Sequence, residues 1–284
     1  MSIVVMVDSG ASFSRTMLKK YGISLLPYNV IFKNGDCYKD VIDIKNQNDL
    51  IKIIDEHGDF PRIDQVGVDQ IEAYFRKYID RGDDILYISV SSGLSNAYNE
   101  VLQVANKFDS GIIEVIDSLN VGAGETLLAV CAKDYISKGY GIKQTAKYLN
   151  NIKHHIKSCY TIGNTTCLYR QCRCMQIQDN YMDFYHRIPI GEIDNGKIVL
   201  TFSARNHELA MQVLKNTIID YTKDADINHI IVSYSGNKDD ALIIKGFIHK
   251  HLKDFNIILL ENSSVVFINT GINTLGISFL LNKK

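Results

Sequence analysis

The sequence contains no tryptophan, only three prolines and no long apolar run. A membrane-spanning helix needs about 20 consecutive, mostly apolar residues, and no stretch of this chain approaches that length. The first residues, Met1–Asp8, lack the basic start of a signal peptide, and their apolar run is shorter than such a peptide needs. We therefore expect a cytoplasmic protein.

Nucleotide-binding fingerprints and an excess of one charge are absent as well. The chain has neither a G-x-G-x-x-G motif nor the lysine of a P-loop, which argues against ATP or NAD as a ligand. Its 31 Lys and Arg residues nearly balance its 32 Asp and Glu residues, giving a formal net charge of −1. Because no broad basic field results, we expect no nucleic-acid partner.

Six cysteines are present, and three of them, Cys167, Cys172 and Cys174, lie close together in the sequence. Their spacing, C-x4-C-x-C, matches no common zinc-binding pattern, and a fourth ligand would have to come from elsewhere. In a cytoplasmic protein these residues are expected to be reduced thiols that pack as small hydrophobic side chains. We predict no metal site.

Strands and helices alternate in the first half of the chain, which predicts a mostly parallel sheet flanked by helices. The second half adds a hairpin around Asp194-Asn195-Gly196, a sequence suited to a type I′ turn. It also has further strand–helix units and a final strand expected over Val265–Asn269. We predict a two-domain α/β protein: residues 1–157 with the parallel sheet, and residues 158–284 with a mixed sheet.

The strongest local signal is the segment Ile85–Tyr98, where a buried-looking strand runs into Ser91–Ser95 and then into a helix expected over 97–108. Hydroxyls and free backbone N–H groups at such a strand-to-helix turn suit an anionic head group. In open α/β sheets, ligands bind beyond the carboxyl ends of the strands. Four expected strand ends carry small or polar residues: Asp8–Gly10, Ser91–Gly93, Asp117-Ser118 and Asn269–Gly271.

These pieces resemble the DegV family of bacterial fatty-acid-binding proteins, over nearly the whole chain. The matching segments are Asp8-Ser9 (the DS motif), Tyr38–Asp40 (YxD), Ser91–Ser95 with Tyr98 (SSGLSGTY), Ile116–Ser118 (IDS), Asp194–Lys197 (the hairpin), and Thr270-Gly271 with Leu275-Gly276 (HTGPGxLG). The most specific of them is Ser91–Ser95 with Tyr98.

The resemblance implies a non-catalytic acyl-chain carrier without a cofactor, which holds a long-chain fatty acid between two domains. It implies that the carrier presents the carboxylate to a separate ATP-dependent kinase, which makes an acyl phosphate. Peripheral contact with a membrane could serve lipid exchange. The residues expected at the ligand are Ser91, Ser92, Gly93, Asn269, Thr270, Gly271, Ile63 and Asp64. Arg173, which matches the arginine of LxxGGR, would face the partner or the phosphoryl group.

The sequence departs from the family pattern on one side of the expected site. Where the family has TSQPS, this chain has Ile63–Gly67, so the hydroxyls are missing and Asp64 adds a negative charge. Where the family has the histidine of HTGPG, this chain has Asn269, which can donate a hydrogen bond but cannot carry a charge.

Two other functions stay open at this point. A serine among Ser91, Ser92 and Ser95 could be the nucleophile of a small hydrolase or transferase, which would need a base and an orienting acid within reach. Alternatively, the chain is a degenerate relative with a regulatory or structural role, whose tunnel is filled by side chains.

Overall fold

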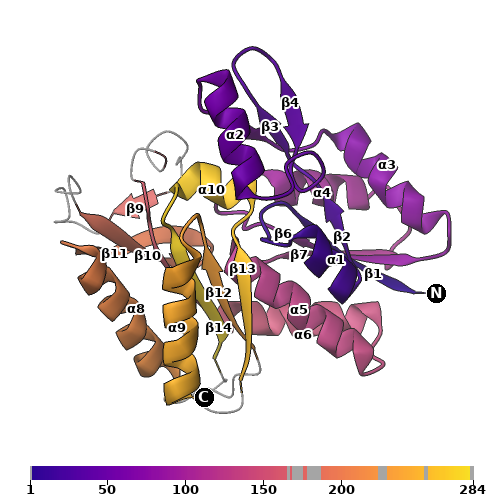
Figure 1. Ribbon diagram of the computed structural model, residues 1–284. Coiled ribbons are helices and arrows are strands. Elements are labelled where there is room, and N and C mark those ends of the chain that lie inside the picture. The colour runs from indigo at the N-terminus through magenta and orange to yellow at the C-terminus, as the bar shows by residue number, and fades with distance from the viewer. Residues whose placement is uncertain are drawn as a thin grey trace.

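The computed structural model describes residues 2–164, 167, 175–177, 187–222, 229–252 and 255–281. Figure 1 shows a first sheet in the N-terminal part of the chain and a second sheet in the C-terminal part. The first sheet is parallel throughout, in the order β2-β1-β6-β7. Its strands are β1 (Ile3–Asp8), β2 (Ile23–Leu26), β6 (Asp84–Ser89) and β7 (Ile113–Asp117).

Alternating side chains of the first sheet enter two separate cores. Val5 and Val7 pack with one core and Met6 with the other, because successive side chains of a strand point to opposite faces. The helices involved are α1 (Arg15–Tyr21), α5 (Ala123–Ser137) and α6 (Ile142–Ile152) on one face, and α3 (Val68–Ile79) and α4 (Ala97–Ala105) on the other. Helix α4 ends three residues earlier than the sequence predicted, with Asn106 at its C-cap position.

The second sheet is mixed, in the order β13-β12-β14-β8-β10-β11-β9. Its strands are β8 (Ile156–Thr161), β9 (Met175–Ile177), β10 (Ile188–Asp194), β11 (Lys197–Ala204), β12 (His229–Tyr234), β13 (Asn256–Glu261) and β14 (Leu275–Leu280). Helices α8 (His207–Thr222) and α9 (Lys238–His251) lie side by side on its outer face (Figure 1). The predicted hairpin is confirmed as β10 and β11, which pair up to Asp194 and Lys197.

Helix α5 joins the two sheets. Its first ten residues, Ala123–Ala132, are all buried, and they share a core with Val5 of the first sheet and with Ile231 of the second. A helix that is apolar on all sides is expected to be buried on all sides. The α/β class with a parallel and a mixed sheet is confirmed, while the predicted boundary near residue 157 stays a prediction, since β8 starts there but the core continues across it.

A third, smaller unit lies between these sheets and the solvent at one end of the molecule (Figure 1). It consists of the antiparallel strands β4 (Cys37–Lys39), β3 (Asn29–Ile31) and β5 (Arg62–Asp64), and of helix α2 (Gln47–His57). Its core includes Phe267 and Ile268, which belong to helix α10 (Ser264–Thr270). The small sheet therefore packs directly on a segment from the far end of the chain.

The expected strand over Val265–Asn269 is wrong, because this segment forms α10. Ser263 caps the helix by accepting a hydrogen bond from the Val266 N–H, and Gly271 ends it with a positive φ of 80°. The β-branched residues suggest a strand, but short apolar runs fit a buried helix equally well. Here the N-cap and the terminal glycine decide the outcome.

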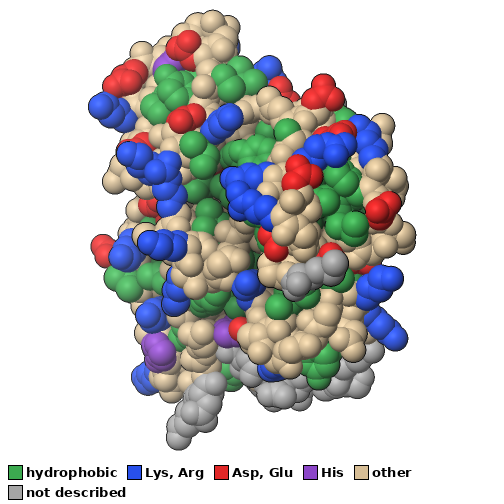
Figure 2. Space-filling model, turned by 90° about the vertical axis from the view of Figure 1, so that its right-hand side faces the viewer, with side chains coloured by type: hydrophobic (Ala, Val, Ile, Leu, Met, Phe, Trp, Pro, Cys, Tyr) green, Lys and Arg blue, Asp and Glu red, His purple; other side chains and the backbone are tan. Residues whose placement is uncertain are grey.

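On the face shown in Figure 2, basic and acidic side chains are interspersed, and hydrophobic side chains appear mainly in the recesses between them. This surface agrees with the balanced charge of the sequence. Within the part of the chain that the structure describes, no helix is long and apolar enough to span a bilayer.

Candidate functional site

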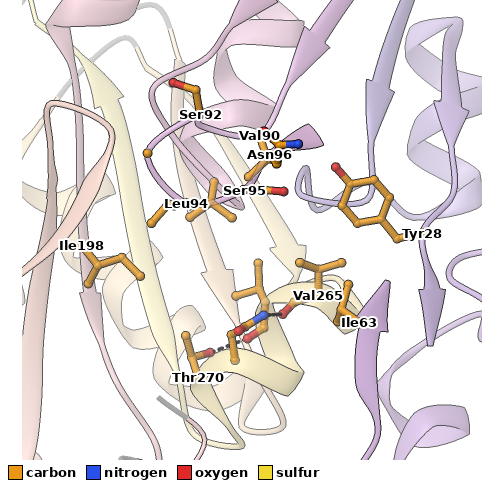
Figure 3. A pocket seen from close by; sticks show the side chains of 14 residues that line it. Tyr28, Ile63, Val90, Ser92, Leu94, Ser95, Asn96, Ile198, Val265 and Thr270 are labelled. Carbon is orange, nitrogen blue, oxygen red and sulfur yellow. Dashed lines mark hydrogen bonds between the residues drawn. The ribbon is translucent and has the colours of Figure 1, made fainter. Parts of the chain in front are cut away.

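A cavity of about 510 Å³ lies where the first sheet, the small sheet, α10 and the β10–β11 hairpin meet (Figure 3). Its walls consist of Tyr28, Ile63, Val90, Ser92, Gly93, Leu94, Ser95, Asn96, Val121, Ile198, Val265, Val266, Asn269 and Thr270. These side chains are mostly apolar, and the polar ones are neutral hydroxyls and amides. Ligand pockets typically have volumes of about 300–1,000 Å³ and mostly apolar walls with a few polar groups.

The turn Ser91–Ser95 forms one wall, but its backbone N–H groups are not free as the sequence predicted. The Ser91 carbonyl accepts hydrogen bonds from the N–H groups of Leu94 and Ser95, at 3.0 and 3.1 Å. The Gly93 N–H donates to the Ser91 hydroxyl oxygen, at 3.1 Å. The turn thus satisfies its own donors, as buried backbone groups must, and the expected N–H cradle for an anion is not formed.

Ser92 belongs to the cavity wall, but its hydroxyl points toward Asp117 and not into the cavity. Its hydroxyl donates to Asp117 Oδ2, and its N–H donates to Asp117 Oδ1 at 3.1 Å. Figure 3 shows the hydroxyl turned away from Thr270 on the opposite wall. Asp117 is the last residue of β7, so two of the predicted strand ends do meet, but they bind each other.

Helix α10 forms the opposite wall and brings Asn269 and Thr270 to the cavity. Asn269 Nδ2 donates to the Val265 carbonyl at 2.7 Å, and Thr270 Oγ1 donates to the Val266 carbonyl at 2.8 Å. Both bonds lie within the helix and are drawn in Figure 3. An amide nitrogen carries two hydrogens, so Asn269 retains one donor for a ligand, whereas Thr270 retains acceptor capacity alone.

The tip of the β10–β11 hairpin closes a third side. The Ser91 hydroxyl donates to the Gly196 carbonyl at 2.7 Å, and a Cβ atom at Gly93 would lie 2.6 Å from that same carbonyl oxygen. Such a distance is too short for a real Cβ contact, so the close approach requires glycine at position 93. The hairpin also places Ile198 in the cavity wall.

Five predicted site residues line the cavity, namely Ile63, Ser92, Gly93, Asn269 and Thr270. The others do not. Ser91 lies behind the wall and binds the hairpin, Asp64 pairs with Arg62 at 3.1 Å on the surface, and Gly271 packs against Asn164. Arg173, Cys172 and Cys174 lie outside the described residues, and Cys167 is buried.

Sequence reasoning missed most of the apolar wall, including Tyr28, Val121 and Ile198. Tyr28 comes just after the carboxyl end of β2, so the rule that ligands bind at strand ends would have identified it. The sequence offers no comparable indication for Val121 and Ile198. The sequence of a loop or a hairpin does not reveal whether an apolar residue lines a cavity or packs in a core.

A buried acid pair lies directly behind this wall. The Asp8 carboxylate accepts hydrogen bonds from the N–H groups of Gly10 and Val90 at 2.7 and 3.0 Å, and from the hydroxyls of Tyr87 and Ser89 at 3.3 Å each. Burial raises the pKa of Asp8, and the hydrogen bonds from Val90, Gly10 and Tyr87 oppose that shift. The carboxylate therefore anchors the end of β6, from which the Ser91–Ser95 turn starts.

Glu125 of α5 is fully buried beside Asp8, and within the described part of the chain no basic side chain balances its carboxyl group, whose nearest donor is the Ala11 backbone N–H. Burial, together with the neighbouring Asp8 charge, raises the pKa of Glu125 well above its usual value. We infer that Glu125 is protonated in the folded protein at neutral pH, since an unpaired buried charge is very unfavourable.

None of the described residues in the cavity walls is a histidine, so the part of the chain that the structure describes supplies no base for the serine-nucleophile hypothesis at this site. Among the residues whose positions are described, no group of three or more His, Cys, Asp or Glu side chains could hold a metal ion.

The family model described as "Uncharacterised protein, DegV family" matches residues 2–282. A DegV domain-containing protein of Staphylococcus aureus (strain COL) is 23% identical over 279 residues, which are 98% of both chains. A DegV domain-containing protein of Clostridium acetobutylicum is 26% identical with the same coverage.

Solved structures share the fold at low identity. A DegV lipid-binding protein of Thermotoga maritima is 20% identical, with a TM-score of 0.86 and 100% of both chains covered. A fatty-acid-binding DegV family protein of Thermus thermophilus is 19% identical, with a TM-score of 0.88 over 99% of this chain and 100% of that one. The Fatty Acid Kinase (Fak) B3 protein of Streptococcus pneumoniae, loaded with linoleic acid, is 15% identical, with a TM-score of 0.82 and the same coverage. Since the family model spans nearly all of the sequence, this chain belongs to the DegV family.

Proposed function

We propose that this protein binds a long-chain fatty acid in the 510 Å³ cavity, as a non-catalytic carrier without a cofactor. The observation that carries the proposal is the cavity itself, whose mostly apolar wall suits a hydrocarbon tail and whose Asn269 side chain retains one hydrogen-bond donor for the carboxylate. The relatives described as fatty-acid-binding proteins support the same ligand class. An open cavity of this size speaks against the ligand-free alternative.

Burial of the tail supplies most of the affinity in this proposal. Each buried CH₂ group contributes about 0.8 kcal/mol, which corresponds to about fourfold in affinity. Among the wall residues that the structure describes, the carboxylate meets neutral partners, since none of them is Lys, Arg or His. The ligand's chain length should therefore govern affinity more strongly than its head group does.

The first experiment is native mass spectrometry of the purified protein, followed by a thermal-shift series with saturated fatty acids of increasing length. Binding should tighten with each added carbon until the cavity is full. Ile198→Trp, which fills the cavity, should abolish the shift, whereas Ile243→Trp on the exposed face of α9 should retain it. No copurified lipid and no shift with any acid would overturn the proposal.

We further propose that the bound acid is presented to a separate ATP-dependent kinase subunit. The Fak B3 neighbour suggests this role. The kinase would transfer the γ-phosphoryl group of ATP to a carboxylate oxygen, giving acyl phosphate and ADP. Incubation of the loaded protein with such a kinase and ATP, followed by hydroxylamine trapping, should yield the acyl hydroxamate. Its absence with bound lipid would remove the kinase role and leave fatty-acid binding intact.

In this second proposal, Arg173 would face the partner or the phosphoryl group, and peripheral contact with a membrane would serve lipid exchange. Arg173→Ala should then reduce acyl phosphate formation without changing fatty-acid affinity. An equal loss of binding would instead place this residue at the ligand.

A further inference from the structure

Tyr28 differs from the rest of the wall of the 510 Å³ cavity. It is the one aromatic side chain among the described wall residues, and it is only 4% exposed. Its ring packs with other apolar side chains of the same wall, namely Ile63, Val90, Val121 and Val265. The apolar part of the wall is therefore concentrated around Tyr28.

The backbone and the ring of Tyr28 are both held in place. The Tyr28 N–H donates to the Ser9 hydroxyl oxygen at 3.0 Å, and the Tyr28 carbonyl accepts from the Asp40 N–H at 2.9 Å. The ring packs against Val90 and against Val265, which lies near the start of α10. A large side chain in such close packing cannot move aside without strain. Tyr28 therefore bounds the cavity as a fixed surface.

The donor that can reach a carboxylate lies away from Tyr28. Asn269, whose amide retains this donor, follows Val265 by four residues on α10, which is about 6 Å along a helix axis. Figure 3 shows Thr270 across the cavity from Tyr28, and it shows the Tyr28 hydroxyl directed toward Val90. Along α10 the cavity thus changes from an apolar end at Tyr28 to an end with polar groups at Asn269 and Thr270.

Two features disfavour a ligand carboxylate at the Tyr28 end. Burial, together with the neighbouring Asp8 carboxylate, raises the pKa of the Tyr28 hydroxyl well above its usual value, and Asp8 would repel a second carboxylate across the poorly screened interior. Ser95, which points toward Tyr28 in Figure 3, donates to Gln65 Oε1 at 3.4 Å and accepts from the Ala97 N–H at 3.2 Å. The hydroxyl hydrogen of Ser95 is therefore used within the protein.

We propose that the Tyr28 ring is the end stop of the cavity: it contacts the methyl end of the bound fatty acid and sets the longest acyl chain that the protein accepts. This role rests on the proposed fatty-acid binding and deepens it, since it names the residue that selects chain length. Each buried CH₂ group adds affinity until the cavity is full, and a further carbon must displace a packed side chain. The affinity should therefore have a maximum at one chain length, which Tyr28 sets.

The test is a series of titrations with even-numbered saturated fatty acids, from laurate to behenate, on the wild-type protein and on Tyr28→Val. The wild-type affinity should rise about fourfold per added carbon, pass through a maximum and then fall. Tyr28→Val removes the ring, so the maximum should move to acids about two carbons longer. An unchanged maximum in a variant that still binds fatty acids would overturn the proposal.

Phe75→Val is the matched control, because Phe75 is a fully buried aromatic residue of the core beside α3 and α4 and does not line the cavity. It should lower stability as well but leave the maximum at the wild-type length. If Tyr28→Val does not fold, Tyr28→Leu decides. It should move the maximum by about one carbon, which odd-numbered acids resolve, and no movement would overturn the proposal.

Tyr28→Phe separates the role of the ring from that of the hydroxyl. We expect the wild-type maximum and an affinity within about twofold of wild type, because the hydroxyl lies beside Asp8 and not at the head group. A loss of about tenfold that is equal for every acid would show that the hydroxyl binds the carboxylate, and would overturn the proposal.

The orientation of the ligand is measured by photocrosslinking and mass spectrometry of the digested protein. A fatty acid with a diazirine at its methyl end should label Tyr28, whereas a diazirine next to the carboxyl group should label Asn269 or Thr270. The reverse pattern would overturn the proposal. If the wild-type protein bound no fatty acid of any length, the proposed function itself would be refuted, whereas binding with a maximum that does not depend on Tyr28 refutes the end stop alone.

Discussion

The two main walls of the 510 Å³ cavity, the Ser91–Ser95 turn and helix α10, are stabilised by different kinds of contacts. The Ser91–Ser95 turn is held by hydrogen bonds within itself, to Asp117 and to Gly196 of the hairpin, and the residue pattern that forms it is local. Helix α10 is held by contacts with the small sheet and with Tyr28 and Val90 of the first sheet's loops, and its residues alone suggested a strand. The turn therefore supports the cavity wall. Helix α10, which depends more on contacts with other elements, retains the Asn269 side-chain donor that can reach a ligand.

The largest expected effect comes from breaking the contact between the turn and the hairpin. Gly93→Ala would place a Cβ atom 2.6 Å from the Gly196 carbonyl oxygen, which is backbone and cannot rotate away. We expect a loss of stability of about 1–3 kcal/mol, measured by urea unfolding, and weaker fatty-acid binding as Ile198 moves. Gly246→Ala in α9, where a Cβ meets open space, should instead stabilise by about 0.5–1 kcal/mol. Similar results for the two variants would contradict the close approach.

The acid pair behind the turn provides a pH-dependent test. The folded-state pKa of Glu125 is raised, so its contribution to stability is fully present below the unfolded pKa of about 4.3 and is lost as pH rises above it. Glu125→Gln removes this cost and should stabilise the protein by about 1–3 kcal/mol at pH 8, with a smaller gain at pH 5. Urea unfolding at both pH values measures this.

The control for that experiment is Glu56→Gln, which is exposed on α2 and should give the same small change at both pH values. If Glu125→Gln destabilised the protein equally at pH 5 and pH 8, Glu125 would have to be charged in the folded state.

On the α10 wall, Asn269→Ala should weaken fatty-acid binding about tenfold, equivalent to about 1.4 kcal/mol, because a hydrogen bond to a charged group contributes about that much. Stability should fall less, since Asn269 is only partly buried and its bond to Val265 is local. Isothermal titration with palmitate measures the loss. Unchanged affinity would mean that the carboxylate lies elsewhere.

Ser92→Ala on the turn should have the smallest effect, under about threefold in affinity, because the Ser92 hydroxyl donates to Asp117 rather than into the cavity. The same palmitate titration gives a direct comparison of the two walls. A tenfold loss here would show that Ser92 rotates toward the ligand on binding, and would reverse the roles assigned to the turn and to α10.

Much of this architecture was predictable because it depends on local patterns. Alternation of strands and helices predicted the α/β class, Asn195-Gly196 predicted the hairpin, and Ser91–Ser95 indicated a strand end at the 510 Å³ cavity. The strand expected over Val265–Asn269 failed because an apolar β-branched run fits a buried helix as well as a strand. Asp64, which was expected at the ligand, pairs with Arg62 on the surface in the structure, and its contact with a ligand stays a prediction.

The sequence by itself determined the class of fold and the positions of the turns, since these follow from hydrophobic periodicity and from turn chemistry, whereas the need for glycine at position 93 comes from the tertiary contact with the Gly196 carbonyl. The tertiary structure decided which groups face the cavity. Whether a hydroxyl such as that of Ser92 reaches a ligand depends on a competing acceptor, Asp117, located 25 residues away. Three-dimensional packing decides which acceptor such a hydroxyl binds. The serine-rich turn that indicates the site in the sequence therefore supports the cavity wall in the structure, and its Ser92 hydroxyl does not enter the cavity.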